Sequence, residues 1–362
     1  MKHAPRRSQR FLAAAAAAAL LAAPLLSGCN SSTSSSAGDG IGVVATTTQI
    51  CDYVKQIASG SKDINLTCLL APNASAHDHE MTPKEMNALS NAKLFLVNGV
   101  DLEHFLDSAV EASGFKGTMV VTTGILTANE VKDPSAAAQN DKGKPYKVDR
   151  GDQKVNVAPW PFAPEPGEKA EFEYDPHVWT SPKNAKVQVH NIGEALKKAD
   201  PANAQQFGTM VASYEKNLDA LDKWVMEAMN SVPAGQRVLF TSHDAFGYFS
   251  RDYDVKFIGA ALSDFNAQSD ATAAHIKASA EEVKKSGAVA LFAENSNNSK
   301  SIEAIARAAG VKAVIGGDAL YGDSLGPDGS AGETYIKSIV HNVTTLTEEW
   351  DGTVPALPEE LK

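Results

Sequence analysis

Three histidines in this sequence lie where proteins with parallel sheets commonly bind ligands. His77 comes after a strand-like run at residues 64–70, His243 follows another at residues 238–241, and His177 follows a long loop. Loops beyond the carboxyl ends of the strands are the usual ligand sites of open α/β sheets. Imidazole nitrogen suits zinc, and three imidazoles with one carboxylate form a common tetrahedral ligand set. The three positions therefore predict a metal site.

The remaining histidines of the body favour a simpler interpretation. Four of them lie in helical segments among charged or small residues: His104, His190, His275 and His341. Histidine on a helix surface is ordinary, so we expect these side chains to be solvated or hydrogen-bonded locally. They are therefore not predicted as metal ligands.

The run HDHE at residues 77–80 does not complete an enzyme motif. A zinc protease helix places a second histidine three residues after His-Glu, but Met81, Thr82 and Pro83 follow here. The sequence also has no Gly-x-Ser-x-Gly nucleophile elbow. A surface-anchored zinc hydrolase and a surface adhesin stay open as alternatives, although catalytic zinc keeps one ligand position free for water. We therefore expect a binding protein and not an enzyme.

The N-terminus has the layout of a secretory signal peptide, which we place at residues 1–28. Four basic residues precede an apolar run at residues 11–26, which is shorter than the roughly 20 residues of a membrane-spanning helix. The sequence Leu-Ser-Gly-Cys at residues 26–29 resembles the lipobox of bacterial lipoproteins. That resemblance implies cleavage before Cys29 and acylation of its thiol, for example with palmitate. The chain is thus expected to be exported and lipid-anchored to the extracytoplasmic face of the bacterial cell membrane.

Residues 29–40 predict a flexible tether, because the stretch after Cys29 is mostly Ser, Thr and Gly and has no large apolar side chain. Removal of the signal peptide takes away four positive charges and changes the formal net charge from −11 to −15. An acidic body makes nucleic acid an unexpected partner. About 320 folded residues exceed one comfortable hydrophobic core and suggest two domains.

From residue 41 onward, strand-like and helical segments alternate, which is typical of parallel sheets covered by helices. Strand-like runs lie at residues 43–47, 64–70, 94–97, 119–122, 238–241, 255–258, 289–292 and 313–315. Helical patterns lie at residues 50–57, 83–92, 102–112, 245–251, 270–286 and 299–309. We therefore predict an α/β protein with two lobes at residues 41–200 and 233–362, each with a parallel sheet flanked by helices.

A single long helix is predicted between the lobes at residues 201–232. Asp200 and Pro201 are typical of a helix start, and Pro233 ends the pattern. Apolar residues recur at spacings of three and four along one face: Phe207, Val211, Tyr214, Leu218, Leu221, Val225 and Met229. Such a helix would join the lobes rigidly, although a core helix of one lobe fits the pattern equally well. Residues 124–174, rich in proline and charge, predict a long functional or mobile loop.

Cys51 and Cys68 are the two cysteines of the folded body. Export permits a disulfide, and Cys51 would open a helix while Cys68 would lie near the end of a neighbouring strand. A disulfide between them would stabilise the fold by about 3 kcal/mol through loss of chain entropy in the unfolded state. A thiolate zinc site is less favoured, because neither cysteine has a second one at short spacing.

Four segments resemble the ligand motifs of the zinc and manganese solute-binding lipoproteins of ABC importers. They read AHDHEMTP at residues 76–83, DPHVWTSPKNA at 175–185, SHDAFGYF at 242–249 and LYGDSL at 320–325, and NGVDLE at 98–103 fits a turn of the family. The resemblance covers residue 43 to the C-terminal helix. It implies two lobes joined by a rigid long helix, with His77 and His177 as metal ligands from the first lobe and His243 and Asp323 from the second.

The resemblance also implies partners and a cargo. The expected partners are an integral-membrane permease with its ATPase, and the protein itself is expected to be a monomer. Manganese-type relatives tend to have Glu in place of the third histidine, so His243 favours zinc, with manganese as the alternative. No histidine lies between His104 and His177, where many zinc-importing relatives have a histidine-rich loop.

Two positions compete with this ligand set. His79 stands where many relatives have an aromatic residue, so it is a candidate auxiliary ligand, although His-x-His in a loop is often simply polar. Asp318 lies close to Asp323 in sequence and is the alternative carboxylate.

Overall fold

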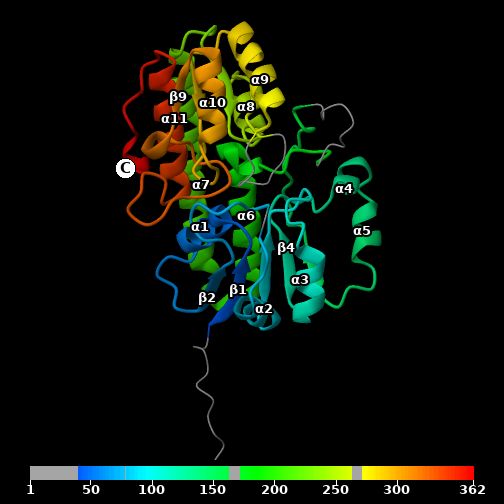
Figure 1. The fold of residues 1–362 in the computed structure, drawn as a ribbon. Helices are drawn as coiled ribbons and strands as arrows, with labels where there is room; N and C mark the ends of the chain where they lie inside the picture. The colour runs from blue at the N-terminus through cyan, green and yellow to red at the C-terminus, as the bar shows by residue number, and fades with distance from the viewer. Residues whose placement is uncertain (1–39, 78, 163–171, 263–270) are drawn as a thin grey trace, which may run out of the picture. The chain divides into compact units, whose positions relative to one another are not determined.

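The first lobe is built on a five-stranded sheet in the order β2-β1-β3-β4-β5 (Figure 1). The computed structural model describes residues 40–77, 79–162, 172–262 and 271–362. The strands are β1 (Ile41–Ala45), β2 (Ile64–Cys68), β3 (Leu94–Val97), β4 (Thr118–Val121) and β5 (Lys147–Asp149). All neighbouring strands are parallel. Their carboxyl ends therefore meet at one edge of the sheet.

Helices cover both faces of this sheet because its strands are apolar on both sides. Successive residues of a strand point to opposite faces, so Leu94 and Leu96 join one core and Phe95 and Val97 another. The first core includes residues of α1 (Thr48–Ile57), and the second includes residues of α2 (Pro83–Ser90) and α3 (Leu106–Ser113). Burial on both faces explains why β3 is an uninterrupted apolar run.

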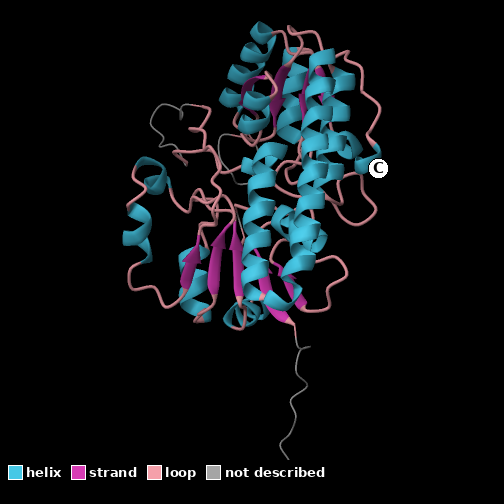
Figure 2. Cartoon of the chain, turned by 180° about the vertical axis from the view of Figure 1, so that it is seen from behind, coloured by secondary structure: helices cyan, strands magenta, loops and turns pink. Residues whose placement is uncertain are grey.

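Two long helices pack against each other, α6 (Pro182–Ala199) and α7 (Ala204–Ser231), and both are seen in the view from behind (Figure 2). All seven apolar residues predicted for one face of the long helix are buried in α7. A short 3-10 turn at Pro201–Asn203 precedes α7, so the α-helix begins three residues after the proline. Because α7 contacts α1 of the first lobe and α11 (Tyr335–Glu349) of the second, it joins the two lobes as predicted.

The second lobe contains two parallel strand pairs covered by helices. One pair is β6 (Val238–Thr241) with β7 (Lys256–Ala260), and the other is β8 (Ala290–Phe292) with β9 (Lys312–Val314). The helices are α8 (Gly247–Asp252), α9 (Ala273–Ser286), α10 (Lys300–Ala309) and α11. The predicted α/β class, with parallel strands and helices in two lobes, is confirmed.

The prediction of one long loop at residues 124–174 is wrong in its first half. The structure places α4 (Ala128–Lys132), α5 (Ala136–Asp141) and the edge strand β5 in this region. These elements are only three to six residues long, so they are too short to show the apolar periodicity that identifies longer helices and buried strands. Arg150 fixes them instead, because its guanidinium contacts Glu130 in α4 and Asp141 in α5.

A disulfide between Cys51 and Cys68 joins α1 to the end of β2. No helix among the described residues is both long enough and apolar enough to span a bilayer. The predicted signal peptide, Cys29 and the tether before Gly40 lie outside the described residues.

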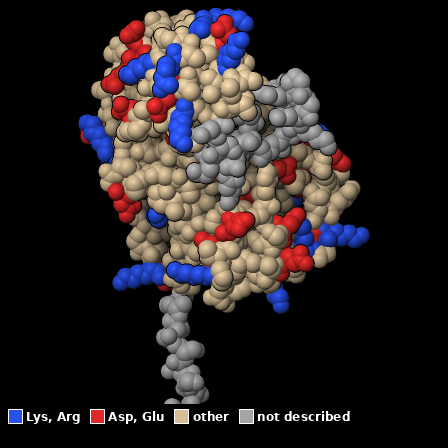
Figure 3. All heavy atoms as spheres, viewed as in Figure 1, with Lys and Arg blue, Asp and Glu red and all other residues tan. Residues whose placement is uncertain are grey.

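Charged side chains of both signs are interspersed over the described part of the face shown in Figure 3. Among the residues drawn in colour, the basic side chains are thus separated by acidic and uncharged ones.

Candidate metal centre

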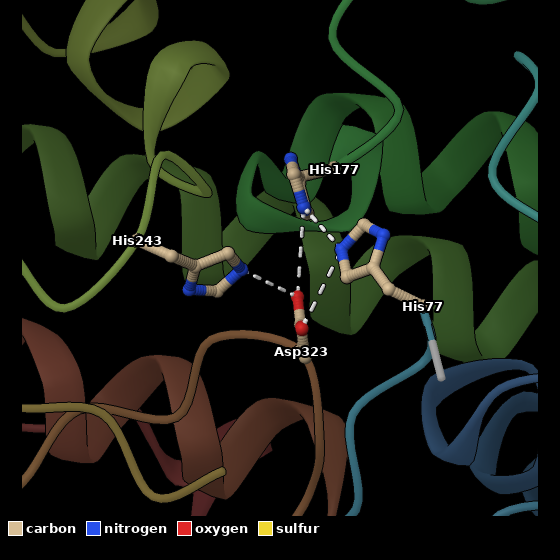
Figure 4. Close-up of side chains that lie close together, drawn as sticks. All are labelled: His77, His177, His243 and Asp323. Carbon is tan, nitrogen blue, oxygen red and sulfur yellow. Dashed lines mark hydrogen bonds and ion pairs between the residues drawn. The ribbon is translucent and has the colours of Figure 1, made fainter. Parts of the chain in front are cut away.

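Four side chains bring one potential ligand atom each into a single group: His77, His177, His243 and Asp323 (Figure 4). The Nε2 atoms of His77 and His177 are 3.0 Å apart, and each lies 3.5 Å from a carboxylate oxygen of Asp323. Nε2 of His243 lies 3.0 Å from Asp323 Oδ1. All four atoms lie within 4.8 Å of one another, and all four residues are buried. Within the described part of the chain, no second group of this kind occurs.

Loops near strand ends carry these residues, and the loops come from both lobes. His77 lies between β2 and α2, and His177 lies shortly before α6. His243 follows β6, and Asp323 lies between β9 and α11. Ser75 connects two of these loops, because its hydroxyl accepts the backbone N–H of His77 (3.2 Å) and donates to Asp323 Oδ2 (3.2 Å). Segments that follow β2, β6 and β9 thus supply three of the four residues, as expected for open α/β sheets, and the segment before α6 supplies the fourth.

Two further buried carboxylates orient the rings of His177 and His243. Asp175 Oδ1 lies 2.8 Å from Nδ1 of His177 and accepts the backbone N–H of the same residue. Glu294 Oε2 lies 2.8 Å from Nδ1 of His243, and its other oxygen accepts the backbone N–H of His243. A carboxylate at Nδ1 favours the tautomer that leaves Nε2 as the electron-pair donor. Both rings are therefore set to bind a cation through Nε2.

Asp323 belongs to the second lobe, but first-lobe side chains hold its backbone. Gln49, at the start of α1, donates from Nε2 to the carbonyl oxygen of Asp323 over 3.1 Å. Trp179 donates its indole N–H to the carbonyl oxygen of Gly322 over 2.9 Å. The position of the carboxylate therefore depends on contacts between the lobes.

Aromatic rings pack against the ligand group on the side of the predicted long loop. Phe172 lies between the rings of His77 and His104, at centroid distances of 5.7 and 5.3 Å. Trp160 contacts Phe172 at 5.5 Å and His177 at 6.0 Å. Apolar rings exclude water and so strengthen electrostatic interactions among the buried polar groups.

Burial and charge act in opposite directions on the titrating groups of the site. Burial favours neutral His243, but the charges of Asp323 and Glu294 outweigh it and hold the pKa of His243 well above its ordinary value. Burial likewise favours the neutral form of Asp323, but His243 and His77 lower the pKa of this carboxyl well below its ordinary value. Burial lowers the pKa of His77. In the metal-free protein, pairing with Asp323 therefore favours the protonated form of His243, and the same pairing favours the ionised form of Asp323.

The competing candidates lie outside the ligand group. His79 lies 3.6 Å from a carboxylate oxygen of Glu85 and packs edge-on against Phe105. Asp318 is exposed in a 3-10 turn at the end of β9.

Three of the four other histidines contact polar groups outside the ligand group. His275 and His341 lie 3.2 and 3.0 Å from backbone carbonyl oxygens, and His190 contacts two carboxylates. His104 differs, because it stacks on Phe172 beside the ligand group. None of the four is a member of that group.

Asp175 and Glu294 have roles that the sequence reasoning did not assign. Asp175 precedes His177 by two residues, which was a usable signal for a carboxylate behind an imidazole. Glu294 follows the carboxyl end of β8 by two residues, so the strand-end rule that identified His243 could have found it as well. Gln49 and Trp179 hold the backbone at Asp323 and Gly322, which are far from them in the sequence. No sequence pattern predicts these two contacts.

The chain matches the protein family described as "Zinc-uptake complex component A periplasmic" over residues 43–349. It is 32% identical over 318 residues to the zinc-binding protein TroA of Treponema pallidum, covering 87% of this chain and 90% of TroA. It is 29% identical over 327 residues to the manganese-binding lipoprotein MntA of Bacillus subtilis, covering 89% of this chain and 94% of MntA.

A solved structure of the periplasmic zinc binding protein TroA from Treponema pallidum has the same fold. Its TM-score is 0.64 at 27% sequence identity, over 85% of this chain and 98% of TroA. The family match, the identity to relatives over nearly their whole length and the shared fold agree. This chain therefore belongs to the family of periplasmic zinc-uptake components, the metal-binding substrate-binding proteins of ABC importers.

Proposed function

We propose that this protein binds one zinc ion with His77, His177, His243 and Asp323 and delivers it to the permease and ATPase of an ABC importer. The observation that supports this most directly is the buried convergence of three imidazole nitrogens and one carboxylate oxygen within 4.8 Å. Four protein ligands of these kinds suit a tetrahedral zinc ion that is held without a free position for water.

The spacing of the ligand atoms supports zinc as the cargo. Zinc–nitrogen bonds of roughly 2.0–2.1 Å in a tetrahedron separate neighbouring ligand atoms by about 3.3 Å. With Oδ1 as the ligand oxygen of Asp323, three of the distances between ligand atoms lie between 3.0 and 3.5 Å: His77 to His177, His177 to Asp323 and His243 to Asp323. Small side-chain movements would therefore complete the site.

The proposed delivery of the ion to an importer is supported by the fact that its ligands come from both lobes. An ion held by His77 and His177 on one side and His243 and Asp323 on the other bridges the lobes, so its release can be coupled to their relative position. As a member of a family of solute-binding proteins, the chain is not an enzyme. A zinc hydrolase is therefore no longer an alternative.

We also propose where the protein is located in the cell. Cys29 carries the lipid anchor on the extracytoplasmic face of the membrane, and the folded body is a monomer beyond a short tether. The lipobox-like sequence supports this, and the relative MntA is itself a lipoprotein. Mass spectrometry of the N-terminal peptide tests it, and a mature chain that begins elsewhere or lacks acylation contradicts it.

Calorimetry on metal-stripped protein tests the zinc proposal. We expect binding of one zinc ion per chain, and metal analysis of protein purified without chelator should find zinc in the same ratio. Absence of heat with zinc would overturn the proposal.

Single variants test the ligand set against a matched control. His243→Ala should weaken zinc binding more than about a hundredfold, beyond the range typical of residues that merely support ligands. His275→Ala removes an imidazole from the same lobe that contacts the carbonyl oxygen of Ala260, so its zinc affinity should equal that of the wild type. Equal losses in the two variants would mean that the third ligand is wrongly placed.

Manganese is the second candidate, because one relative over nearly the whole chain is a manganese-binding lipoprotein. Manganese prefers more oxygen ligands than this group offers. Because nitrogen-rich sites bind zinc more tightly than manganese in general, affinity alone does not distinguish the two cargoes. Metal analysis of protein purified from cells without chelator does, and manganese in place of zinc would support the second candidate.

A further inference from the structure

Asp175, the carboxylate behind His177, is in contact with the other lobe. Its Oδ1 atom is engaged by His177, at 2.9 Å from the backbone nitrogen and 2.8 Å from Nδ1. The side chain is fully buried. Its second oxygen, Oδ2, is also buried and accepts no hydrogen bond from the residues that the structure describes. What surrounds Oδ2 therefore decides where the carboxylate can sit.

Gly247, the first residue of α8, provides the space that Oδ2 occupies. A Cβ atom at this position would lie 2.3 Å from Asp175 Oδ2 and 3.5 Å from its Cγ. The backbone of Gly247 is not among the positive-φ residues, so its conformation does not demand glycine. Glycine is therefore needed at position 247 only because a side chain there would collide with the Asp175 carboxylate.

The neighbouring residue of α8 holds the backbone of the same aspartate. The hydroxyl of Tyr248 donates to the carbonyl oxygen of Asp175 over 2.7 Å and accepts the backbone N–H of Ala158 at 3.1 Å. The start of α8 thus contacts Asp175 at both its carboxylate and its main chain. This arrangement is reciprocal to the one at Asp323, whose second-lobe backbone is held by Gln49 of the first lobe.

We infer that Gly247 is a positioning residue for metal binding, which acts through Asp175 to orient the imidazole of His177. This inference rests on the proposed function of His177 as a ligand. An added methyl group at position 247 would move the Asp175 carboxylate by about 1 Å to reach ordinary contact distance. Because Oδ1 is held by His177, that movement would lengthen its contact with Nδ1 beyond hydrogen-bond range. His177 would then lose the partner that directs Nε2 toward the other ligand atoms.

A double-mutant cycle tests this coupling by zinc calorimetry. Gly247→Ala should weaken zinc binding about 10- to 100-fold, as does loss of an outer partner of a ligand. Asp175→Ala should cause a loss of similar size, and the double variant should bind no more weakly than Asp175→Ala alone. The inference would be overturned if the loss of zinc affinity in the double variant equalled the product of the losses in the two single variants. Asp175→Ser provides a second background for the same comparison should Asp175→Ala fold poorly.

Gly208→Ala is the matched control, because a Cβ atom at this glycine of α7 meets nothing within 4 Å. It should bind zinc as the wild type does. A loss equal to that of Gly247→Ala would show that the effect has nothing to do with Asp175.

A measurement without metal separates this inference from the proposed function. Nitrogen NMR of the metal-free protein reports the tautomer of His177, which should carry its proton on Nδ1 in the wild type and become mixed in Gly247→Ala. An unchanged tautomer in that variant would overturn the inference, whether or not the wild type binds zinc. Failure of the wild type to bind zinc would instead overturn the proposed function.

Discussion

Trp179 of the first lobe donates its indole N–H to the carbonyl oxygen of Gly322 in the second lobe over 2.9 Å. Gly322 immediately precedes Asp323, so this bond helps to place the carboxylate. Trp179→Phe keeps an aromatic ring and removes the donor. We expect zinc affinity to fall about tenfold, as is usual when a residue that supports a ligand is lost, and calorimetry measures the change.

Trp224→Phe is the control for this prediction. Trp224 is as buried as Trp179, and its indole N–H donates to the carbonyl oxygen of Pro355, away from the ligand group. Both variants lose one hydrogen bond, so each should lose about 1 kcal/mol of unfolding free energy. Only Trp179→Phe should lose zinc affinity, and equal affinities in the two variants would contradict the assigned role.

Zinc binding should release about one proton near neutral pH. The charges of Asp323 and Glu294 keep the pKa of His243 well above its ordinary value despite burial, so we expect the metal-free protein to carry a proton there. Zinc must displace that proton, and its affinity should therefore fall as the pH falls. Calorimetry in buffers of different ionisation enthalpy counts the protons released. His275→Gln should release as many as the wild type, and a wild type that releases none would contradict the proton on His243.

The raised pKa of His243 also predicts how the stability of the metal-free protein depends on pH. Because the pKa of His243 is higher in the folded chain than in the unfolded chain, its contribution is fully present below about pH 6.5. That contribution should be lost as the pH rises through the raised pKa. Asp323 has a lowered pKa, so its contribution is present above about pH 3.8 and is lost under more acidic conditions. Urea unfolding with chelator present, at pH 6.5 and above, should show a decline that His243→Gln reduces.

Loss of the disulfide should destabilise the fold with little effect on zinc binding. Cys51 and Cys68 are 17 residues apart, so removing the cross-link by replacing both with Ala should cost about 3 kcal/mol of unfolding free energy. The start of α1 keeps its own cap, because the Thr47 side chain accepts the N–H of Ile50, and Gln49 should stay in place. Urea unfolding checks this, and reducing agent should weaken the wild type but leave the double variant unchanged.

The segments that the sequence predicted well are those whose burial is continuous. β3 and β6 have the predicted bounds, because four successive buried residues leave an unbroken apolar run. The buried face of α7 was readable for the related reason that a long helix repeats its pattern over many turns. His243 could be singled out because β6 ends just before it, where ligands are commonly bound.

The contacts that hold the candidate site could not be read in the same way. Gln49 and Asp323 are separated by 274 residues, and only the completed fold brings them together. In the sequence, Gly247 resembles any glycine at the start of a helix, and only the fold shows that Asp175 packs against it. Such pairs depend on how the lobes pack, and no local pattern encodes that packing.

Arg150 holds together α4 and α5, which lie in the first half of the predicted loop. Its Nε and Nη2 atoms donate to the two carboxylate oxygens of Glu130, at 2.9 and 2.7 Å, and its Nη atoms reach Asp141 at 2.7 and 3.0 Å. The Glu130 side chain is only 2% exposed, so Arg150→Met would leave a buried carboxylate without its cation. We expect a loss of about 3 kcal/mol of unfolding free energy.

Hydrogen exchange should show which elements Arg150→Met destabilises. In Arg150→Met, amides of α4, α5 and β5 should exchange faster, while zinc affinity stays that of the wild type because Arg150 contacts no ligand residue. Lys132→Met is the matched control, since it removes a cation that pairs with Glu173 at the surface of the same region. Exposed ion pairs contribute little, so this variant should leave exchange in α5 and β5 unchanged. Equal effects of the two variants would mean that these elements are held by their backbone contacts and not by the Arg150 guanidinium.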